Sequence, residues 1–373
     1  MSHINIIRNN MTVSGKVLLH THTTPTGSFI ASPPTPPLSE EKSSSSSAVL
    51  RALEDIRCLK RTGQTRVPTL WPVYKLDAAE FSDLEQRLER DKELAGFAED
   101  KLRLDYFPSS KRLVLRMPGD RHEEFIARIV KEIQDQLEAI RGPSASFARQ
   151  IESRASTTFK SSDPDYGRHD PDAQFKHLKA QFPSVIIEVS HSQKKRDLPH
   201  LADEYILGSD ANIQVVVGID IEYRGDNAGM ATLSVWEPAV VDVEGIDTLV
   251  ARQTINGQMF RDGNGNAISS PTCDLRIPLR DFAPNTIFNE KQAPEEEIVI
   301  TGSKMCEYLQ AAEAQIALID SNMGVKIKKT WKQKRPRELT PEEKLLERDE
   351  KRFKAEEDKV LKMEALADPE YEP

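Results

Sequence analysis

The segment from Ser184 to Val189 constrains the fold of this chain more than any other. Its residues form an apolar, β-branched run whose length is typical of a core strand. Glu188 therefore enters the protein interior, where an ionised carboxylate is costly unless a metal, hydrogen bonds or a cation compensates it. We expect one of these three partners beside Glu188.

A second acidic residue precedes this strand. Asp172 lies in the segment His169–Phe175, at the start of another short strand. An Asp and a later strand-borne Glu can supply the hard oxygen ligands that magnesium or manganese prefers. The sequence thus predicts that the oxygens of Asp172 and Glu188 share one ion position.

This arrangement resembles the restriction-endonuclease-like superfamily, whose signature is PD, a variable gap and (D/E)xK. Here Pro171-Asp172 is followed, after fifteen residues, by Glu188-Val189-Ser190. Within that superfamily the chain is similar to the Uma-type branch of bacteria and to related fungal proteins of unassigned function. The matching positions are Glu188, Val189, Ser190, Ser192, Arg196, Asp197, Leu198, Tyr205 and Asp220, preceded by Met117, Pro118 and His122.

The resemblance covers roughly residues 100 to 285 and implies an α/β (α+β) fold, a mixed sheet flanked by helices. Its core order would be helix-strand-strand-strand-helix-strand. The implied activity is metal-dependent phosphodiester hydrolysis by an endonuclease or exonuclease, with magnesium or manganese held by Asp172, Glu188 and the Val189 carbonyl. Four further residues have auxiliary roles by the same resemblance: His122 and Glu123 in the helix turn facing the metal, and Gln193 and Tyr205, similar to a pair in some exonucleases.

The chain departs from the superfamily where the lysine should stand. That position is Ser190, and the alternative position used in the Uma-type branch is Leu201. Lys194 or Lys195 could reach back over the site and support the attacking water. Two interpretations stay open: a nuclease whose lysine has moved, and a catalytically silent binding or scaffold protein that kept the fold.

Composition bounds the remaining choices. The formal charge of -9 argues against uniform attraction to nucleic acid, although local patches can differ. The three cysteines are widely separated, so a disulfide framework or zinc site is not indicated and a reducing compartment is expected. No apolar run is long enough to span a bilayer, and no secretory signal is present. We expect a soluble, intracellular protein, nuclear or cytoplasmic, without a membrane partner.

Residue patterns divide the chain into consecutive segments. Order is expected to begin near Trp71, with a capping box at Asp77–Glu80. A hairpin at 102–117 and a helix at about 121–140 follow. The length of the Ser-rich stretch 141–170 predicts a mobile flap or insertion beside the site, and 198–207 is expected to be a helix between buried strands. The expected segments are a disordered leader (1–48), a helical N-terminal segment (49–98), an endonuclease-like core (99–285), a packing helix region (286–325), a basic linker (326–337) and a charged helix or tail (338–373).

The basic linker is a candidate nucleic-acid contact. It could instead be a nuclear-import signal or a solvated linker, and the sequence leaves these three readings open. The charged helix after it, at about 340–365, could bind a protein partner. The basic residues of the linker are Lys326, Lys328, Lys329, Lys332, Lys334, Arg335 and Arg337.

Overall fold

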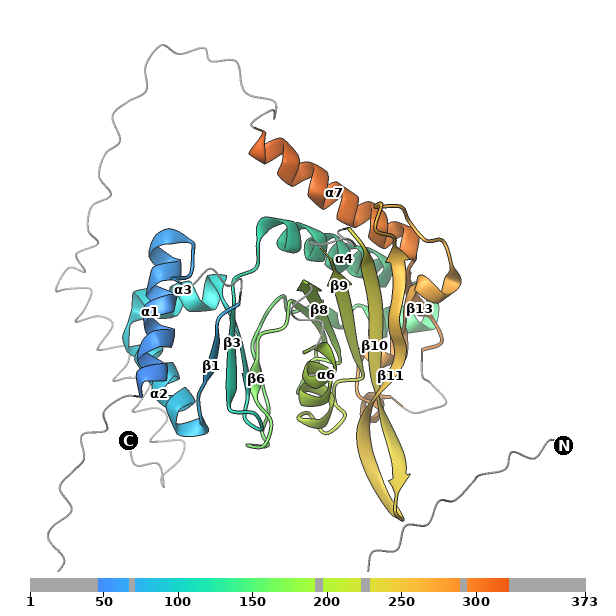
Figure 1. The fold of residues 1–373 in the computed structure, drawn as a ribbon. Helices are drawn as coiled ribbons and strands as arrows, with labels where there is room; N and C mark the ends of the chain where they lie inside the picture. The colour runs from blue at the N-terminus through green and yellow to red at the C-terminus, as the bar shows by residue number, and fades with distance from the viewer. Residues whose placement is uncertain (1–45, 67–70, 192–196, 223–228, 289–293, 322–373) are drawn as a thin grey trace, which may run out of the picture.

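The structure, a computed structural model, describes residues 46–66, 71–191, 197–222, 229–288 and 294–321. In these ranges the protein has a mixed α/β fold, with helices packed on two sheets and a third, two-stranded sheet (Figure 1). Within the same ranges, none of the helices combines the length and the apolar character that crossing a bilayer requires.

A helical layer forms the N-terminal part of the described chain. It contains α1 (Ser47–Thr62), α2 (Ala78–Arg90) and α3 (Lys92–Lys101), with the short strand β1 (Val73–Lys75) between α1 and α2. Val49, Leu53 and Ile56 on one face of α1 are buried in the core of this layer. The expectation that order begins near Trp71 is therefore wrong. The preceding serine run obscured an apolar face with helical spacing, and Ser46 caps that helix by accepting a hydrogen bond from Val49 N–H.

Helix α2 begins as its sequence predicts. Asp77 accepts a hydrogen bond from the backbone N–H of Glu80, and the Glu80 carboxylate accepts one from the backbone N–H of Asp77. This reciprocal pair satisfies two N–H groups that the first helical turn leaves without partners. Phe81, Leu84 and Leu88 then face the same core as α1.

The first sheet has five strands in the order β1-β3-β2-β6-β5. The expected hairpin is confirmed as β2 (Arg103–Phe107) and β3 (Arg112–Arg116), but it does not belong to the same sheet as Glu188. The stretch 141–170, predicted to be a mobile flap or insertion beside the site, sends strands into both sheets and also forms a short helix. These are α5 (Ala145–Ala148), β4 (Ile151–Ser153), β5 (Phe159–Lys160) and β6 (Arg168–His169).

The second sheet has six strands in the order β11-β10-β9-β8-β7-β4. Strands β8 and β9 run parallel because α6 connects them, whereas the other pairs are antiparallel. The predicted helix 198–207 is confirmed by α6. The bounds are β7 (Ala173–His177), β8 (Val185–His191), α6 (Leu198–Leu207), β9 (Val215–Ile221), β10 (Ala231–Val243) and β11 (Ile246–Arg261).

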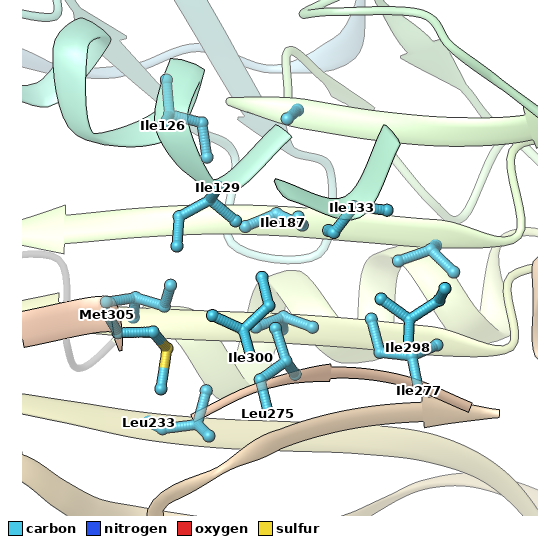
Figure 2. Close-up of a cluster of buried hydrophobic side chains, with 14 of the residues drawn as sticks. Ile126, Ile129, Ile133, Ile187, Leu233, Leu275, Ile277, Ile298, Ile300 and Met305 are labelled. Atoms are coloured by element: carbon cyan, nitrogen blue, oxygen red, sulfur yellow. The ribbon is translucent and has the colours of Figure 1, made fainter. Parts of the chain in front are cut away.

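The two faces of the second sheet are covered differently. One face packs against α4 (Asp120–Ala139), α7 (Gly302–Asp320) and the small sheet of β12 (Leu275–Pro278) and β13 (Glu297–Ile300). Figure 2 shows this layer, where isoleucines of α4 lie over Ile187 of β8. The other face packs against α6. Since side chains alternate along a strand, β8 sends Val185, Ile187 and Val189 to the first face and Ile186 to the second.

Strands β10 and β11 form a hairpin that extends past the end of β9 (Figure 1). The predicted strand at 231–236 ends where pairing with β9 ends, at Trp236. Beyond that residue β10 continues to Val243, paired to β11 alone. Sequence reasoning missed this extension because an acidic residue and a proline, Glu237 and Pro238, follow Trp236 and resemble the end of a strand.

Candidate functional site

Glu188 lies at the centre of a buried ionic cluster between the two sheets. Strand alternation places it on the face of β8 that carries Ile186 and faces α6. Its residue surface is fully buried. Because full burial removes all solvation of the carboxylate by water, Glu188 requires a compensating partner from the protein, as expected.

Asp172 is held immediately before β7. Its Oδ2 accepts a hydrogen bond of 2.8 Å from the backbone N–H of Val189, the residue after Glu188. This contact ties the two strand ends together, so the Asp172 and Glu188 side chains share one region. The backbone N–H of Val189 thus fixes Asp172 at the site, whereas the Val189 side chain packs in the core layer on the other face of the sheet.

The compensating partner is Arg116, the last residue of β3. Its guanidinium Nε lies 2.7 Å from Asp105 Oδ2, and one terminal nitrogen lies 2.9 Å from Asp172 Oδ1. The other terminal nitrogen donates to the Asp170 carbonyl at 2.8 Å and lies 3.7 Å from Glu188 Oε2. The Arg116 side chain is only 2% exposed. One buried cation therefore contacts three carboxylates.

His122, in the first turn of α4, adds a second cation. Its Nε2 lies 3.1 Å from Asp172 Oδ2, so His122 faces the site from the first turn of the helix, as expected. Burial alone would lower the pKa of His122, but the charge of Asp172 and its hydrogen bond outweigh burial and raise that pKa to about 9. His122 is thus imidazolium at neutral pH. Glu123 is exposed, 3.7 Å from His122 Nδ1 and 3.6 Å from Arg103.

Tyr205 on α6 completes the environment of Glu188. Its hydroxyl donates a hydrogen bond of 2.6 Å to Glu188 Oε1. Burial, followed by the negative charge of Glu188, holds the pKa of Tyr205 well above its usual range, so this hydroxyl keeps its proton. Glu188 therefore has Tyr205 on one oxygen and Arg116 near the other.

His169 links the cluster to α6 on the far side of Asp105. Its Nδ1 lies 3.6 Å from Asp105 Oδ1, and its Nε2 lies 3.3 Å from Glu204 Oε2. Burial lowers the pKa of His169, but the hydrogen bonds to Asp105 and Glu204 raise it by more than burial lowers it. The pKa of His169 is therefore above its usual value. The ionic network thus runs from α4 to α6.

Ser190 occupies the position where the superfamily signature has lysine. It lies two residues after Glu188 on the same face of β8 and is fully buried. Its hydroxyl donates a hydrogen bond of 2.6 Å to Asp220 Oδ1, across the register pair that joins β8 to β9. The position therefore holds a satisfied neutral side chain.

The remaining candidate residues are not placed. Gln193, Lys194 and Lys195 lie outside the described residues, as do the basic linker 326–337 and the helix expected after it. The described residues that meet at the site are Asp172, Glu188, Val189, His122 and Tyr205, with Ser190 on the same strand face.

Sequence reasoning missed Arg116, Asp105, His169 and Glu204. Arg116 immediately precedes the Met117-Pro118 pair that carries the resemblance, and this proximity was the available signal. The local pattern did not reveal that Arg116 is buried, because β3 has an arginine at both ends. The other one, Arg112, is half-buried and pairs with Asp197.

The donor set does not fit a metal ion as it is arranged. Asp172 and Glu188 face a guanidinium that occupies their shared side, and His122 is protonated on the other side of Asp172. Among the residues that the structure describes, no group of three His, Cys, Asp or Glu side chains is disposed to hold a metal. In this arrangement Asp172 and Glu188 are ion-pair partners of Arg116.

The fold and this cluster define a mixed α/β protein with an arginine-centred ionic site between two sheets. Comparison with family models, with curated proteins and with solved structures finds no match to this chain. The restriction-endonuclease-like resemblance therefore remains an expectation from the sequence.

Proposed function

We propose that this protein is a catalytically silent binding or scaffold protein built on a nuclease-like core. The observation that carries the proposal is the position of Arg116, whose buried guanidinium contacts Asp172 and Glu188, the residues expected to hold magnesium. In this proposal the arginine takes over the charge compensation that the metal supplies in an active enzyme. The cluster then stabilises the junction between the sheets instead of performing hydrolysis.

The chemistry of arginine supports this assignment. A guanidinium stays protonated at any pH a protein encounters, so it cannot yield its charge to an arriving divalent cation. A metal at the carboxylates would face the charge of Arg116 at close range and would also have to displace its hydrogen bonds. Removing one member of a buried ion pair commonly costs about 3 to 5 kcal/mol, which opposes such displacement.

A metal-dependent nuclease is the second candidate. It is favoured by the convergence of Asp172 and Glu188 on one guanidinium, and by the longer distance of 3.7 Å between Glu188 and Arg116. Activity would require Arg116 to leave Glu188 and Lys194 or Lys195 to supply the missing charge. Phosphodiester hydrolysis in DNA or RNA would be the reaction.

A metal titration joined to a cleavage assay separates the two candidates. Magnesium and manganese are titrated calorimetrically into the full-length protein and into the variants Asp172→Asn and Glu188→Gln. Glu152→Gln, at the exposed position of β4, is the matched control. Single-stranded and duplex DNA and RNA are then incubated with each metal. The silent protein binds no metal through Asp172 or Glu188 and cleaves nothing. Metal-dependent cleavage that Glu188→Gln abolishes and Glu152→Gln retains would establish the nuclease instead.

A further inference from the structure

The outer half of the β10–β11 hairpin exposes a strand edge beside a hollow. Strand β9 pairs with β10 only as far as Val216 opposite Trp236. Upstream of β9 the chain does not continue along β10. It forms a turn in which Asp210 and Ala211 hold positive φ angles of 49° and 58°, and the N–H of Ala211 returns to the carbonyl of Ile206. The place next to β10 beyond Trp236 is therefore left without a strand among the described residues.

The geometry of the hairpin turn identifies which backbone groups face that place. Val243 pairs with Ile246 across a two-residue loop, Glu244-Gly245, with φ angles of 55° and 84°. Positive φ at both positions is the signature of the tight turn whose flanking pair shares its hydrogen bonds. Every second residue counted back from Val243 along β10 therefore forms its backbone hydrogen bonds with β11. The residues between them point their backbone N–H and C=O groups away from β11.

Pro238, Val240 and Asp242 are the outward-facing residues. Pro238 agrees with this assignment, because proline lacks an N–H and is tolerated in a strand where that position faces away from the ladder. The edge accordingly offers the carbonyl of Pro238 and both the N–H and the carbonyl of Val240 and Asp242. These are the groups that an added strand would bond.

A hollow of about 400 Å³ lies along this edge. Its apolar wall includes Pro238, Val240 and Leu249, and Val240 is 66% exposed. Val240 and Leu249 are directly opposite in the hairpin register, so their side chains share one face of the ribbon. The rest of the lining comes from the turn 210–214, with Asp210 and Asn212, and from the segment 284–286.

Beyond the cross-strand pair of Glu237 with Arg252, the charged residues of the outer β10–β11 hairpin are acidic. Between Ala231 and Ala251 the sequence contains four acidic residues and no lysine or arginine. The turn 210–214 adds the exposed Asp210, the one charged residue that lines the hollow. A second copy of the hairpin bound at this edge would bring its own carboxylates close to these, and the repulsion between like charges is unfavourable. The four acidic residues of the hairpin are Glu237, Asp242, Glu244 and Asp247.

We propose that the outer edge of β10, at residues 238–242, binds an extended strand of a partner protein that carries apolar and lysine or arginine side chains together on the face toward Val240 and Asp242. The strand continues the sheet in line with β9, and its backbone bonds Val240 and Asp242. Its apolar side chains cover Val240 and Leu249, and its basic side chains, on the same face, reach the carboxylates of Asp242 and Asp247. Addition of a strand to an exposed sheet edge is an established mode of peptide recognition. This site is separate from the Arg116 cluster and does not depend on the function proposed for it.

The test uses the full-length protein and a fluorescein-labelled synthetic peptide that, as a strand, carries valine and lysine on one face and threonine on the other. Fluorescence anisotropy should show saturable binding that weakens as salt rises. Val240→Pro removes the outward N–H without touching the β10–β11 ladder, and should weaken binding about fivefold, as expected for one backbone hydrogen bond. Val240→Thr is the matched control, since it changes the same side chain, keeps the N–H, and should bind more tightly than Val240→Pro.

Charge is tested separately. The double variant Asp210→Asn with Asp242→Asn should bind the lysine peptide more weakly and with less salt dependence, and the same peptide with glutamate in place of lysine should not bind. Unchanged melting temperatures would show that the variants fold.

Three results would overturn the proposal. One is equal binding by Val240→Pro and Val240→Thr. Another is a concentration-dependent dimer, seen by sedimentation, that Val240→Pro abolishes, because it assigns the edge to a second copy. The third is peptide binding that appears only when Lys326, Lys328 and Lys329 are changed to Glu, because it assigns the edge to the basic segment of the chain itself.

Discussion

Arg116 and Asp172 form a buried pair, 2.9 Å apart, that joins the last residue of β3 to the residue before β7. Strands β3 and β7 belong to different sheets, so this pairing is also a connection between layers. Asp105 on β2 holds the same guanidinium from its own sheet, and Glu188 approaches it from β8. The stability of the sheet junction should therefore depend on this one arginine.

Changing Arg116 to Met should lower the free energy of unfolding by about 3 to 5 kcal/mol, because Asp105, Asp172 and Glu188 would then be buried without their shared cation. Urea unfolding followed by circular dichroism measures the loss. Arg154→Met is the control: Arg154 is half-exposed and 4.0 Å from Glu152, so its loss should stay within about 0.5 kcal/mol. Equal stability of the two variants would mean that the cluster contributes no net support.

Tyr205→Phe should cost about 1 to 3 kcal/mol, because it leaves Oε1 of the buried Glu188 without its hydroxyl donor. Thermal or urea unfolding of Tyr205→Phe, Glu188→Gln and the double variant gives the coupling between the two side chains. A coupling near zero would contradict the contact. Tyr308→Phe, which loses a hydroxyl bonded to Glu132 at a less buried position, should cost less.

Stability should depend on His122 in a defined pH range. Its folded pKa, about 9, lies above the unfolded value of 6.5, so the protonated form is favoured by folding. The resulting stabilisation, about 3 kcal/mol, is fully present below pH 6.5 and is lost as pH rises through about 9. The difference in unfolding free energy between the wild type and His122→Gln should shrink across that interval. A difference that stays constant from pH 6 to 9.5 would show that His122 does not titrate with folding.

The α1 helix should be an integral part of the fold. Ile56 is fully buried in the N-terminal core, so Ile56→Ala should cost about 2 to 5 kcal/mol. Leu50 lies on the same helix and is about half exposed, and Leu50→Ala is the matched control with little expected effect. The two variants are compared by the denaturant concentration at the midpoint of unfolding, provided that the dependence of unfolding free energy on denaturant is the same for both. Similar midpoints for the two variants would indicate that α1 is not packed as described.

Lysine at position 190 distinguishes a silent site from a nuclease that lacks one residue. The Ser190 side chain is buried and bonded to Asp220, so Ser190→Lys should introduce crowding and a buried cation and lower the melting temperature. Under the silent-protein proposal, the variant cleaves no nucleic acid with magnesium or manganese. Cleavage by Ser190→Lys, absent from Ser190→Met of similar bulk, would instead identify a dormant active site.

The local elements followed from the sequence. The capping box at Asp77, the apolar face of α4 and the β-branched run of β8 are decided by neighbours within a few residues, and each lies where its pattern predicts. The burial of Glu188 also followed, because the run around it has no polar alternation. The need for a compensating partner was thus evident from the sequence alone.

Tertiary structure decided which partner Glu188 received. Arg116 is 72 positions earlier, and nothing in its own strand distinguishes it from Arg112, which pairs with Asp197 at the partly exposed end of β3. The same holds for the division of the strands between two sheets and for the length of β10 beyond β9. Local propensity sets the conformation of a segment, but the partner of a buried charge depends on contacts between segments distant in sequence, and these are set only when the layers pack.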